Sequence, residues 1–371
     1  MYPTRIQTIS VFDLILPLRR PYSVSGGRVQ VDRMQSVIVR IDTECGLSGW
    51  GESCPFGSAY LPAFAAGIHA GIAELAPRLL GEDPLHPEQL SHIMDGQLSG
   101  HDYVKSALDM ACWDLLGQHT GLPLYALLGG RFSKGVDMMG VCPNDRPEAM
   151  AAAIDELRSI GYRCFSPKVG GDVALDIARI RAILDRIGPG ETIVIDANRA
   201  WRPDEAVRIM NAVADDPRPC FEQPCETLDQ CLSVRRLTRQ PIIVDEAVLS
   251  FVDLLRVQSE HIAEGINIKL GRVGGLTKAR RMRDFCVATG MCMNIEETGG
   301  TLIASTAAVH LAVATPPRWR LATSDNTRLH DVIPASGGYV FEQGQGIPPQ
   351  MPGLGIQPDL QILGAPTARY S

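Results

Sequence analysis

Two lysines and three carboxylates occur at regular intervals in the middle of this chain, and together they could bind a hard cation and move a proton. Each closes a short apolar or β-branched run of the kind that forms a strand. The intervals between them, 28, 26, 23 and 24 residues, are about those of a strand, a helix and two loops. This spacing predicts successive βα units of a barrel, a fold whose active site lies at the C-terminal ends of its strands. The five residues are Lys168, Asp196, Glu222, Asp245 and Lys269.

The carboxylates Asp196, Glu222 and Asp245 offer hard oxygen atoms without His or Cys. Such a ligand set suits Mg²⁺ or Mn²⁺ better than zinc. One carboxylate at a strand end can also be a solvated loop residue or the N-cap of the next helix. Three at consecutive strand ends, with lysines on the neighbouring strands, favour a metal site.

The lysines Lys168 and Lys269 end apolar strands, a poor place for a side chain that only meets solvent. A partly buried lysine near a cation has a lowered pKa and can act as a base near neutral pH. The two strands lie across the predicted barrel from each other, so the lysines should approach a substrate from opposite faces. The alternative is that each lysine pairs structurally with a nearby carboxylate.

Several polar residues beside these five could support the site. Asn198 and Glu246 follow predicted metal ligands and are expected to orient them. Glu296 closes the seventh barrel strand and Asp325 follows the eighth, so both could face a substrate. Glu297 is adjacent to Glu296, and only one of two neighbouring strand residues can point inward.

The overall composition excludes several classes of protein. The 371 residues carry a net charge of −7 with an isoelectric point near 5.7, which argues against nucleic-acid binding. We find no apolar run long enough for a membrane span and no signal peptide, so we expect a cytoplasmic protein. The ten cysteines are scattered and are expected to be reduced. Cys220 and Cys225 lack the further soft ligands that a zinc site needs.

The first third of the chain shows strands followed by helices, which predicts an α+β domain over residues 1–132. Short turns and Gly-Pro breaks separate these elements. The predicted strands cover 4–18, 34–42 and 46–53, and the predicted helices cover 62–80, 86–98 and 103–120.

From residue 133 to 335 strand-like runs alternate with amphipathic helices, such as 147–160 and 276–289. Eight strands with helices between them predict a closed parallel barrel; a doubly wound open sheet is the alternative. The segment 336–371 is rich in Pro and Gly and could fold back on the first domain. The predicted barrel strands are 136–142, 162–168, 192–197, 219–222, 241–245, 264–270, 291–296 and 319–323.

These residues resemble the active site of the enolase superfamily, in its muconate-lactonizing/mandelate-racemase-like branch. The resemblance covers the whole chain and implies an α/β fold: a (β/α)7β barrel with an α+β capping domain that the C-terminal segment completes. It places Asp196, Glu222 and Asp245 on the Mg²⁺ positions and Lys269 on the base of the sixth strand. Lys168 matches the second lysine of a Lys-x-Lys motif, whose first lysine is replaced by Ser166.

Within this superfamily the chain more closely resembles the cis-3-hydroxy-L-proline dehydratases. The resemblance implies a metal-bound amino acid carboxylate, with Lys168 as the base and Lys269 as the acid; the reverse assignment of the two lysines is the alternative. It also implies a homo-oligomer and cap loops near 22–28 and 55–60, including Tyr60, that close over the site. The runs that carry it are PYSVSGGR, WGESCPFG, SGHDYVKSALDMACWDLLGQ, SPKVGG, DANRAW, EQPCETLDQC, KLGRVGGLT and NIEETGGT.

Three other functions are compatible with parts of this pattern. An epimerase or racemase of proline betaine or another amino acid would need the same two lysines. An acid-sugar dehydratase often has a histidine on the seventh strand, where this chain has Asn294 and Glu296. A non-catalytic protein on the same fold would be expected to lose a ligand or a lysine, and all five are present.

Overall fold

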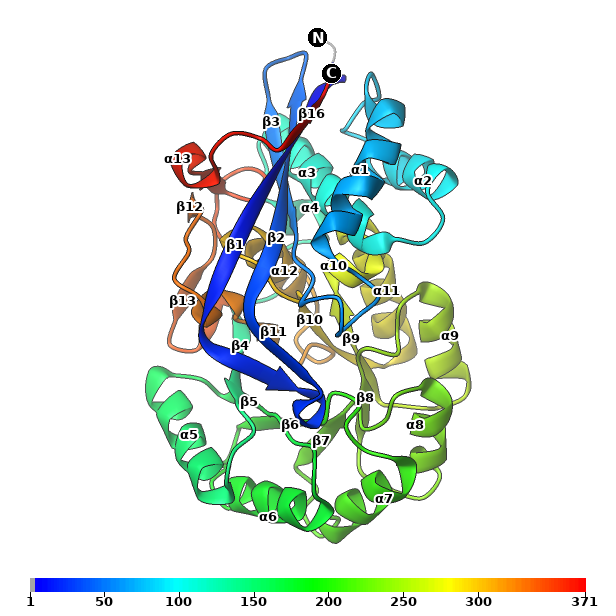
Figure 1. Ribbon diagram of the computed structural model, residues 1–371, viewed down its shortest axis with the longest axis vertical. Coiled ribbons are helices and arrows are strands. Elements are labelled where there is room, and N and C mark those ends of the chain that lie inside the picture. Colours follow the sequence, from blue (N-terminus) through cyan, green and yellow to red (C-terminus); the bar gives the residue numbers. More distant parts are fainter. Residues whose placement is uncertain (1–3) are drawn as a thin grey trace.

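The structure, a computed structural model, describes residues 4–371. The first three residues of the predicted 1–132 domain lie outside this range. The described chain combines a small antiparallel sheet and its helices with a larger parallel barrel (Figure 1). Within the described range, no helix has both the length and the apolar composition needed to cross a membrane.

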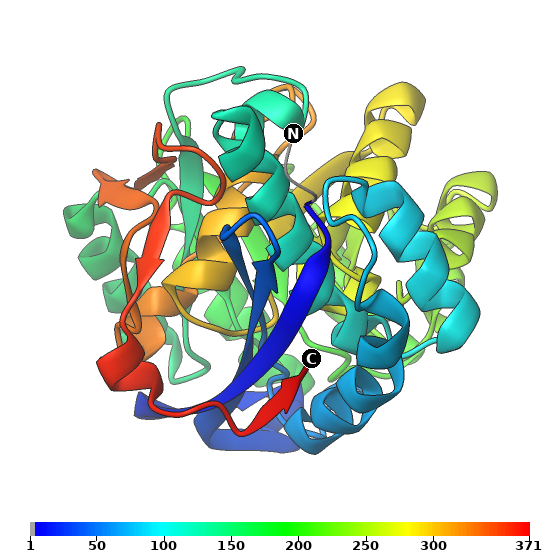
Figure 2. The ribbon, with the colours of Figure 1, turned by 90° about the horizontal axis from the view of Figure 1, so that it is seen from above.

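The N-terminal part of the chain forms a cap, an antiparallel sheet with helices packed against it. Its strand order is β16-β1-β2-β3, so the last strand of the chain lies beside β1 (Figure 2). Because side chains alternate across a strand, β1 buries Ile9 and Val11 against the cap helices and Phe12 in the core shared with the barrel. The cap elements are β1 (Ile6–Val24), β2 (Val29–Thr43), β3 (Ser48–Ser53), β16 (Ala368–Tyr370), α1 (Ala65–Leu79), α2 (Pro87–Gln97), α3 (Asp102–Thr120) and α4 (Leu124–Leu127).

The β1–β2 hairpin is longer than the sequence predicts, and its tip reaches over the barrel (Figure 1). The sequence predicts strands over 4–18 and 34–42, whereas the pairing continues to Val24 and Val29. A register shift before Tyr22 accommodates the two prolines of this stretch. The prolines conceal the strand in the sequence, since each removes a donor from the ladder.

Among residues 4–371, eight parallel strands close into a barrel, which confirms the predicted fold class. Its strands follow the chain from β4 to β10, and the short β11 closes the ring by pairing with β4 and contacting β10. The strands are β4 (Val136–Cys142), β5 (Cys164–Pro167), β6 (Thr192–Asp196), β7 (Pro219–Glu222), β8 (Ile242–Val244), β9 (Gly265–Lys269), β10 (Cys292–Glu296) and β11 (Thr323–Ser324). The helices are α5 (Pro147–Ile160), α6 (Val173–Leu184), α7 (Pro203–Ala212), α8 (Leu228–Arg235), α9 (Phe251–Ser259), α10 (Leu270–Val273), α11 (Leu276–Thr289) and α12 (Leu302–Val313).

Two barrel helices begin and end where the sequence predicts them, at 147–160 and 276–289. Pro147 occupies a first helical position, where its missing N–H costs nothing. Gly161 and Gly290 end the helices in the left-handed conformation that glycine adopts without a steric penalty.

The eighth barrel strand is shorter than predicted. The sequence predicts 319–323, whereas regular pairing with β4 is confined to Thr323–Ser324. The backbone of the preceding residues pairs with β10, where the Met293 N–H donates to the Trp319 carbonyl and the Leu321 N–H donates to the Met293 carbonyl. The residues before Thr323 have the apolar pattern of a strand, but within the described range they pair with a neighbouring strand on one side alone. The regular strand is therefore shorter than the pattern predicts.

The segment after the barrel pairs first with the barrel and then with the cap. β14 pairs antiparallel with β4, and β16 pairs antiparallel with β1. The sequence shows little helical or strand pattern over 340–371, because these elements are very short. Between β11 and β16 the chain forms η2 (Asn326–Leu329), β12 (Ala335–Gly337), β13 (Val340–Glu342), β14 (Gln345–Ile347), β15 (Ile356–Pro358) and α13 (Leu360–Leu363).

Buried carboxylates of the cap bind the first turns of two barrel helices. Glu52 is 0% exposed and accepts hydrogen bonds from the backbone N–H groups of Thr301 and Ala304, at the start of α12. Asp109 accepts one from the N–H of Thr277, at the start of α11. The first N–H groups of a helix have no partner inside it and attract negative charge. These contacts therefore fix the cap on the barrel.

Candidate active site

The five residues predicted to do chemistry lie at one rim of the barrel. Asp196, Glu222 and Lys269 are the last residues of β6, β7 and β9, and Lys168 and Asp245 directly follow β5 and β8. In the parallel register Asp196 is level with Glu222, and Lys168 forms a bridge with Asp196. Strands β5 and β9 are four positions apart in the ring of eight described strands, so the lysines come from opposite sides.

Lys168 forms an ion pair with Asp196, and both side chains are largely buried. Burial by itself lowers the pKa of Lys168, but the negative charge of Asp196 outweighs it and holds that pKa well above its usual value. In this arrangement the lysine is protonated. The lowered pKa expected from the sequence applies beside a bound cation, and it stays a prediction.

Lys269 shares a second carboxylate with an arginine. Its Nζ donates to Asp245 Oδ2 at 2.6 Å, and Arg272 Nη1 donates to Asp245 Oδ1 at 2.5 Å. Burial would raise the pKa of Asp245, but the two cations hold it below its usual value. Although burial lowers the pKa of Lys269, Asp245 raises it above the ordinary range of lysine.

Arg272 is a site residue that the sequence argument missed. Its side chain is 2% exposed, and its Nη2 also donates to the Asn267 carbonyl at 2.6 Å. The signal was available: an arginine within the glycine-rich run that follows Lys269 is an unusual choice for a residue packed between a strand and a helix.

Glu222 lies between the two ion pairs without a cation of its own. Its Oε1 accepts a hydrogen bond from Asn267 Nδ2 at 2.6 Å, and its Oε2 is buried and has no hydrogen-bond partner among residues 4–371. Burial raises the pKa of Glu222 well above its usual value, and the charges of Asp196 and Asp245 raise it further.

The residues fit a divalent cation as a donor set, but they are not arranged as a finished metal cluster. Across the described residues, no group of three or more His, Cys, Asp or Glu side chains has that geometry. Asp196 and Asp245 are turned to their basic partners. A cation is nevertheless the group that the unpartnered oxygen of Glu222 and its two acidic neighbours lack.

The structure brings Asn198 and Glu246 together behind the carboxylates. The backbone N–H of Asn198 donates to Asp196 Oδ1 at 2.8 Å, and its side-chain Nδ2 donates to Glu246 Oε1 at 3.1 Å. Burial, with the charges of Asp245 and Asp196, raises the pKa of Glu246 to about 7. Asn198 thus binds Asp196 directly, and Glu246 is linked to it through Asn198. Their supporting role stays a prediction.

Gln223 also positions a predicted ligand and was missed from the sequence. Its Oε1 accepts hydrogen bonds from the backbone N–H groups of Asp245, at 2.7 Å, and Ala247, at 3.2 Å. Its own backbone has a positive φ of 36°. The side chain of one strand end thus holds the next strand end in place, a contact without a sequence motif.

Ser166, which stands where the resemblance implies a lysine, is 0% exposed on β5. Its Oγ has no hydrogen-bond partner in the described chain. Lys168 therefore has no neighbouring ammonium at this position.

The remaining predicted substrate contacts differ from one another. Glu296 lines the cavity, and its buried Oε1 has no hydrogen-bond partner within residues 4–371. Asp325 also lines the cavity, but it already accepts hydrogen bonds from the hydroxyls of Tyr162, at 2.6 Å, and Tyr339, at 2.9 Å. Glu297 lines the cavity as well: its Oε2 accepts the N–H of Gly271, and its buried Oε1 has no partner in the described chain. Of these three carboxylates, Glu296 is the one that no hydrogen bond within residues 4–371 holds.

A cavity of about 70 Å³ connects these side chains at the rim. Tyr60 of the cap enters it, with its hydroxyl 3.4 Å from both Asp245 Oδ2 and Lys269 Nζ. The lining combines barrel polar groups with cap aromatic residues, so the cap completes the site. Its residues include Tyr22, Phe56, Tyr60, Lys168, Asn198, Glu222, Lys269, Glu296 and Asp325.

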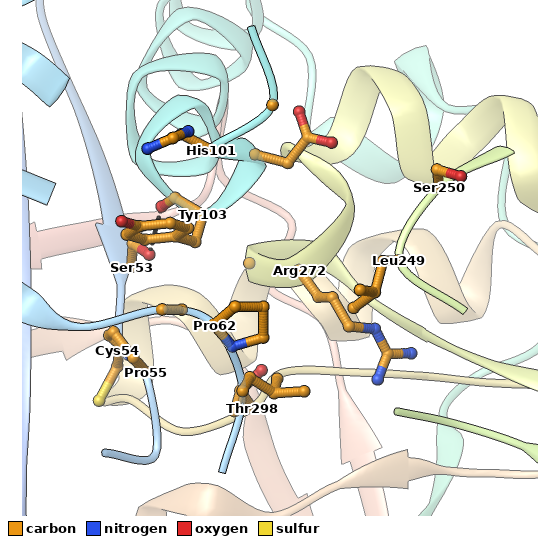
Figure 3. A pocket seen from close by; sticks show the side chains of 15 residues that line it. Ser53, Cys54, Pro55, Pro62, His101, Tyr103, Leu249, Ser250, Arg272 and Thr298 are labelled. Atoms are coloured by element: carbon orange, nitrogen blue, oxygen red, sulfur yellow. Dashed lines mark hydrogen bonds between the residues drawn. The ribbon is translucent and has the colours of Figure 1, made fainter. Parts of the chain in front are cut away.

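A larger cavity of about 410 Å³ lies beside this one, between cap and barrel (Figure 3). None of the two lysines and three carboxylates lines it. Thr298 lines both cavities, and Arg272, which lines the larger one, binds Asp245. Figure 3 places Ser53, Cys54 and Tyr103 on its cap side, opposite Arg272. Its size does not make it the reactive site, because the converging charged groups are in the smaller cavity.

Comparison with known families matches nearly the whole chain. Residues 6–129 match the N-terminal domain of mandelate racemase/muconate lactonizing enzyme, and residues 149–362 match the enolase C-terminal domain-like family. These matches cover the cap and the barrel separately.

Individual relatives agree with this. The chain is 42% identical to cis-3-hydroxy-L-proline dehydratase of Roseibium aggregatum over 99% of this chain and 100% of the relative. It is 32% identical to hydrophobic dipeptide epimerase of Enterococcus faecalis over 91% of this chain and 95% of that protein. A crystal structure of an enolase superfamily member from Roseovarius nubinhibens, complexed with magnesium, is 47% identical and has a TM-score of 0.95, covering 99% of both chains.

Proposed function

The chain belongs to the enolase superfamily, in its mandelate racemase/muconate lactonizing enzyme branch, and on that premise we propose that it is a Mg²⁺-dependent dehydratase of cis-3-hydroxy-L-proline. It is an enzyme of the lyase class, like its full-length relative. The observation that carries the proposal is one cavity in which two lysines from opposite sides of the barrel meet three buried carboxylates. The epimerase relatives make an epimerase of amino acids the second candidate.

Asp196, Glu222 and Asp245 would hold the cation, Mg²⁺ in this proposal and Mn²⁺ as an alternative. When bound, a divalent cation would polarise the substrate carboxylate and so acidify the proton on the adjacent carbon. Asn198 and Gln223 keep Asp196 and Asp245 oriented. Arg272 would remain the partner of Asp245 on the side away from the substrate.

The two lysines divide the proton transfers. In cis-3-hydroxy-L-proline the C3 hydroxyl and the C2 proton lie on opposite faces of the ring, so elimination is anti and needs a base and an acid on opposite faces. We assign the base to Lys168, which accepts the C2 proton at Nζ. The C2–H electrons form the C2–C3 double bond as the C3–O bond breaks, and Lys269 donates its proton to the departing hydroxyl.

The raised pKa of Lys269 keeps its ammonium protonated, as a proton donor must be before the reaction. Lys168 must lose the ion pair with Asp196 before it can accept a proton, since that pair holds it protonated. The first product is Δ2-pyrroline-2-carboxylate, which tautomerises to the Δ1 form.

Glu296 is the proposed partner of the ring ammonium. Its Oε1 is buried without a partner and no hydrogen bond holds its carboxylate in the described chain, whereas Glu297 accepts the Gly271 N–H and Asp325 is held by two tyrosines. A buried charge without a partner is costly, and a ligand with N–H donors would satisfy it. This contact would select a cyclic amino acid over a sugar acid.

The deciding experiment is a proton NMR time course in D₂O with Mg²⁺ and cis-3-hydroxy-L-proline. We expect the substrate to disappear as Δ1-pyrroline-2-carboxylate forms. Deuterium at C2 without loss of water would favour the epimerase. If neither occurs, the proposed substrate is wrong.

A further inference from the structure

Arg199 lies where the cap meets the barrel rim, and it is not one of the residues assigned to the reaction. It follows β6 and has a positive φ of 67°. Its side chain is 16% exposed and points to the cap loop that carries Tyr60: Nη2 donates to the Tyr60 carbonyl at 2.7 Å. Its Nη1 donates to Glu226 Oε1 at 3.0 Å, and its Nε is 3.9 Å from Glu246.

The main chain of the same residue holds the other cap loop. Arg28, at the tip of the β1–β2 hairpin, donates from Nη2 to the Arg199 carbonyl at 2.6 Å. Arg28 is also 3.7 Å from Glu226, which Arg199 binds as well. Two cap loops that are far apart in sequence therefore contact the same arginine, Arg199, and that arginine and Arg28 both contact Glu226.

The tip of the β1–β2 hairpin packs directly against the backbone of a barrel loop, so the contact depends on glycine at the tip. The tip is η1 (Ser25–Gly27), and Gly26 has a φ of +63°. A Cβ added at Gly26 would lie 3.3 Å from the Gly170 carbonyl carbon and 3.4 Å from the Ala200 Cβ. A side chain at Gly26 would therefore be crowded, and one at Gly170 would clash, since its Cβ would lie 2.9 Å from the Gly26 Cα and 2.5 Å from the Ala200 Cβ.

The loop held by Arg199 separates the two cavities. Phe56 and Tyr60 line the small reactive cavity, whereas Leu61, Pro62 and Ala63 line the 410 Å³ cavity behind it (Figure 3). The Tyr60 ring has Lys269 Nζ 5.7 Å and the Arg199 guanidinium 5.6 Å from its centroid. The loop is held against the lysine on one side and has free space on the other.

We propose that Arg199 is a positioning residue that latches both cap loops over the reactive cavity, so that the two loops close and release together. When the hydrogen bonds of Arg199 break, the Tyr60 loop moves into the larger cavity and the hairpin tip moves away from Gly170. The inference rests on the proposed function only in naming the reaction that takes place beneath the closed loops. The latch itself is a property of this chain.

The test compares hydrogen–deuterium exchange in segments 22–29 and 55–63 without substrate, in the wild type and in Arg199→Ala. We expect exchange to rise about tenfold in both segments, because charge-assisted hydrogen bonds are lost. Arg208→Ala is the matched control, since this exposed arginine on α7 contacts only Asp204. It should change neither segment.

Arg28→Ala tests the coupling from the other loop. It should also accelerate exchange in both segments, and the double variant should resemble Arg199→Ala within about twofold, since the two act on one latch. Arg199→Lys keeps the charge but cannot reach both acceptors, so it should be intermediate. If either alanine variant loosens only its own loop, the coupling is refuted; if exchange does not change, the latch is refuted.

Kinetics separate this inference from the proposed function. With cis-3-hydroxy-L-proline, Arg199→Ala should raise KM about tenfold and change kcat less, at an unchanged melting temperature, since the lysines stay in place. An unchanged KM with altered exchange would refute the role in the reaction. A wild type inactive on this substrate would refute the proposed function, and the exchange result would still decide the latch.

Discussion

At the residue scale, the site consists of buried charged side chains, and its carboxylates can bind either a lysine or a cation. Each proposed catalytic lysine is paired with a carboxylate that is also a proposed metal ligand: Lys168 with Asp196, and Lys269 with Asp245. The carboxylates cannot serve a cation fully while they neutralise the lysines. Binding a cation should therefore weaken both ion pairs and lower the pKa of each lysine.

The lysine roles can be separated by isotope exchange. Lys168→Ala should abolish C2 proton exchange and dehydration, since a positioned base contributes about 10²–10⁴-fold. Lys269→Ala should keep measurable C2 exchange while losing elimination. Lys134→Ala, at an exposed lysine, is the control. If C2 proton exchange persists in Lys168→Ala, Lys168 is not the base, and the roles of the two lysines are the reverse of those proposed.

The role of Glu296 predicts how ligands are discriminated. Glu296→Gln should weaken binding of L-proline about tenfold or more, because a charge-assisted hydrogen bond becomes a neutral one. Binding of tetrahydrofuran-2-carboxylate, which has an ether oxygen in place of the ammonium, should change little. Calorimetric titration measures both affinities. An equal loss for both ligands would show that Glu296 does not contact the ring nitrogen.

At the element scale, the strand ends were predictable and the contacts between them were not. The strand-end residues can be found because each closes an apolar run and the runs repeat with βα spacing. This spacing does not reveal the roles of Gln223 and Arg272 or the Arg199–Tyr60 contact, because they depend on which loops become neighbours in the fold. Arg199 and Tyr60, for example, are 139 residues apart in sequence. The tip of the β1–β2 hairpin was hidden by its prolines.

The carboxyl of Asp109, which joins the cap to α11, predicts a pH dependence of stability. Burial raises the pKa of Asp109 to about 7, above the roughly 4 of an unfolded chain. The folded state therefore keeps a proton that the unfolded chain releases. This contribution to stability is complete below pH 4 and is lost as the pH rises through 7.

Asp109→Asn should reduce the fall in the free energy of unfolding between pH 6 and pH 8 by about 1 kcal/mol. Urea unfolding at the two pH values gives this difference. The amide oxygen of Asn can still accept the Thr277 N–H. Asp331→Asn, at an exposed aspartate, is the control. An unchanged pH slope in Asp109→Asn would mean that this carboxyl does not titrate in that range.

At the scale of the whole molecule, the C-terminal segment pairs with both the barrel and the cap, and buried hydrogen bonds join the cap to the barrel. We propose the division 1–132, 133–335 and 336–371, and a homo-oligomer, as the arrangement to test. The cap supplies Tyr22, Phe56 and Tyr60 to the reactive cavity, and the barrel supplies the charged groups. Neither part holds a complete site by itself.

Metal binding should therefore stabilise the entire fold. At Mg²⁺ a hundredfold above its dissociation constant, the gain is about 2.7 kcal/mol, visible as a higher melting temperature that EDTA reverses. Glu222→Gln should be more stable than the wild type without metal, since it removes an acid whose ionised form is disfavoured by burial and by two neighbouring carboxylates, and it should lose the Mg²⁺ response. Glu342→Gln, at an exposed glutamate, should keep the response. A Mg²⁺ response retained in Glu222→Gln would remove Glu222 from the ligand set.

The pairing of β16 with β1 has a consequence for how the chain is made. Thr367 donates to the Val11 carbonyl across 356 residues. At roughly 5–20 residues per second, a ribosome takes about 20–70 s to bridge that distance. Throughout that time β1 has an open edge, the feature by which strands aggregate. A chain released before residue 368 keeps that edge, so truncated translation products are expected to be the aggregating species during expression.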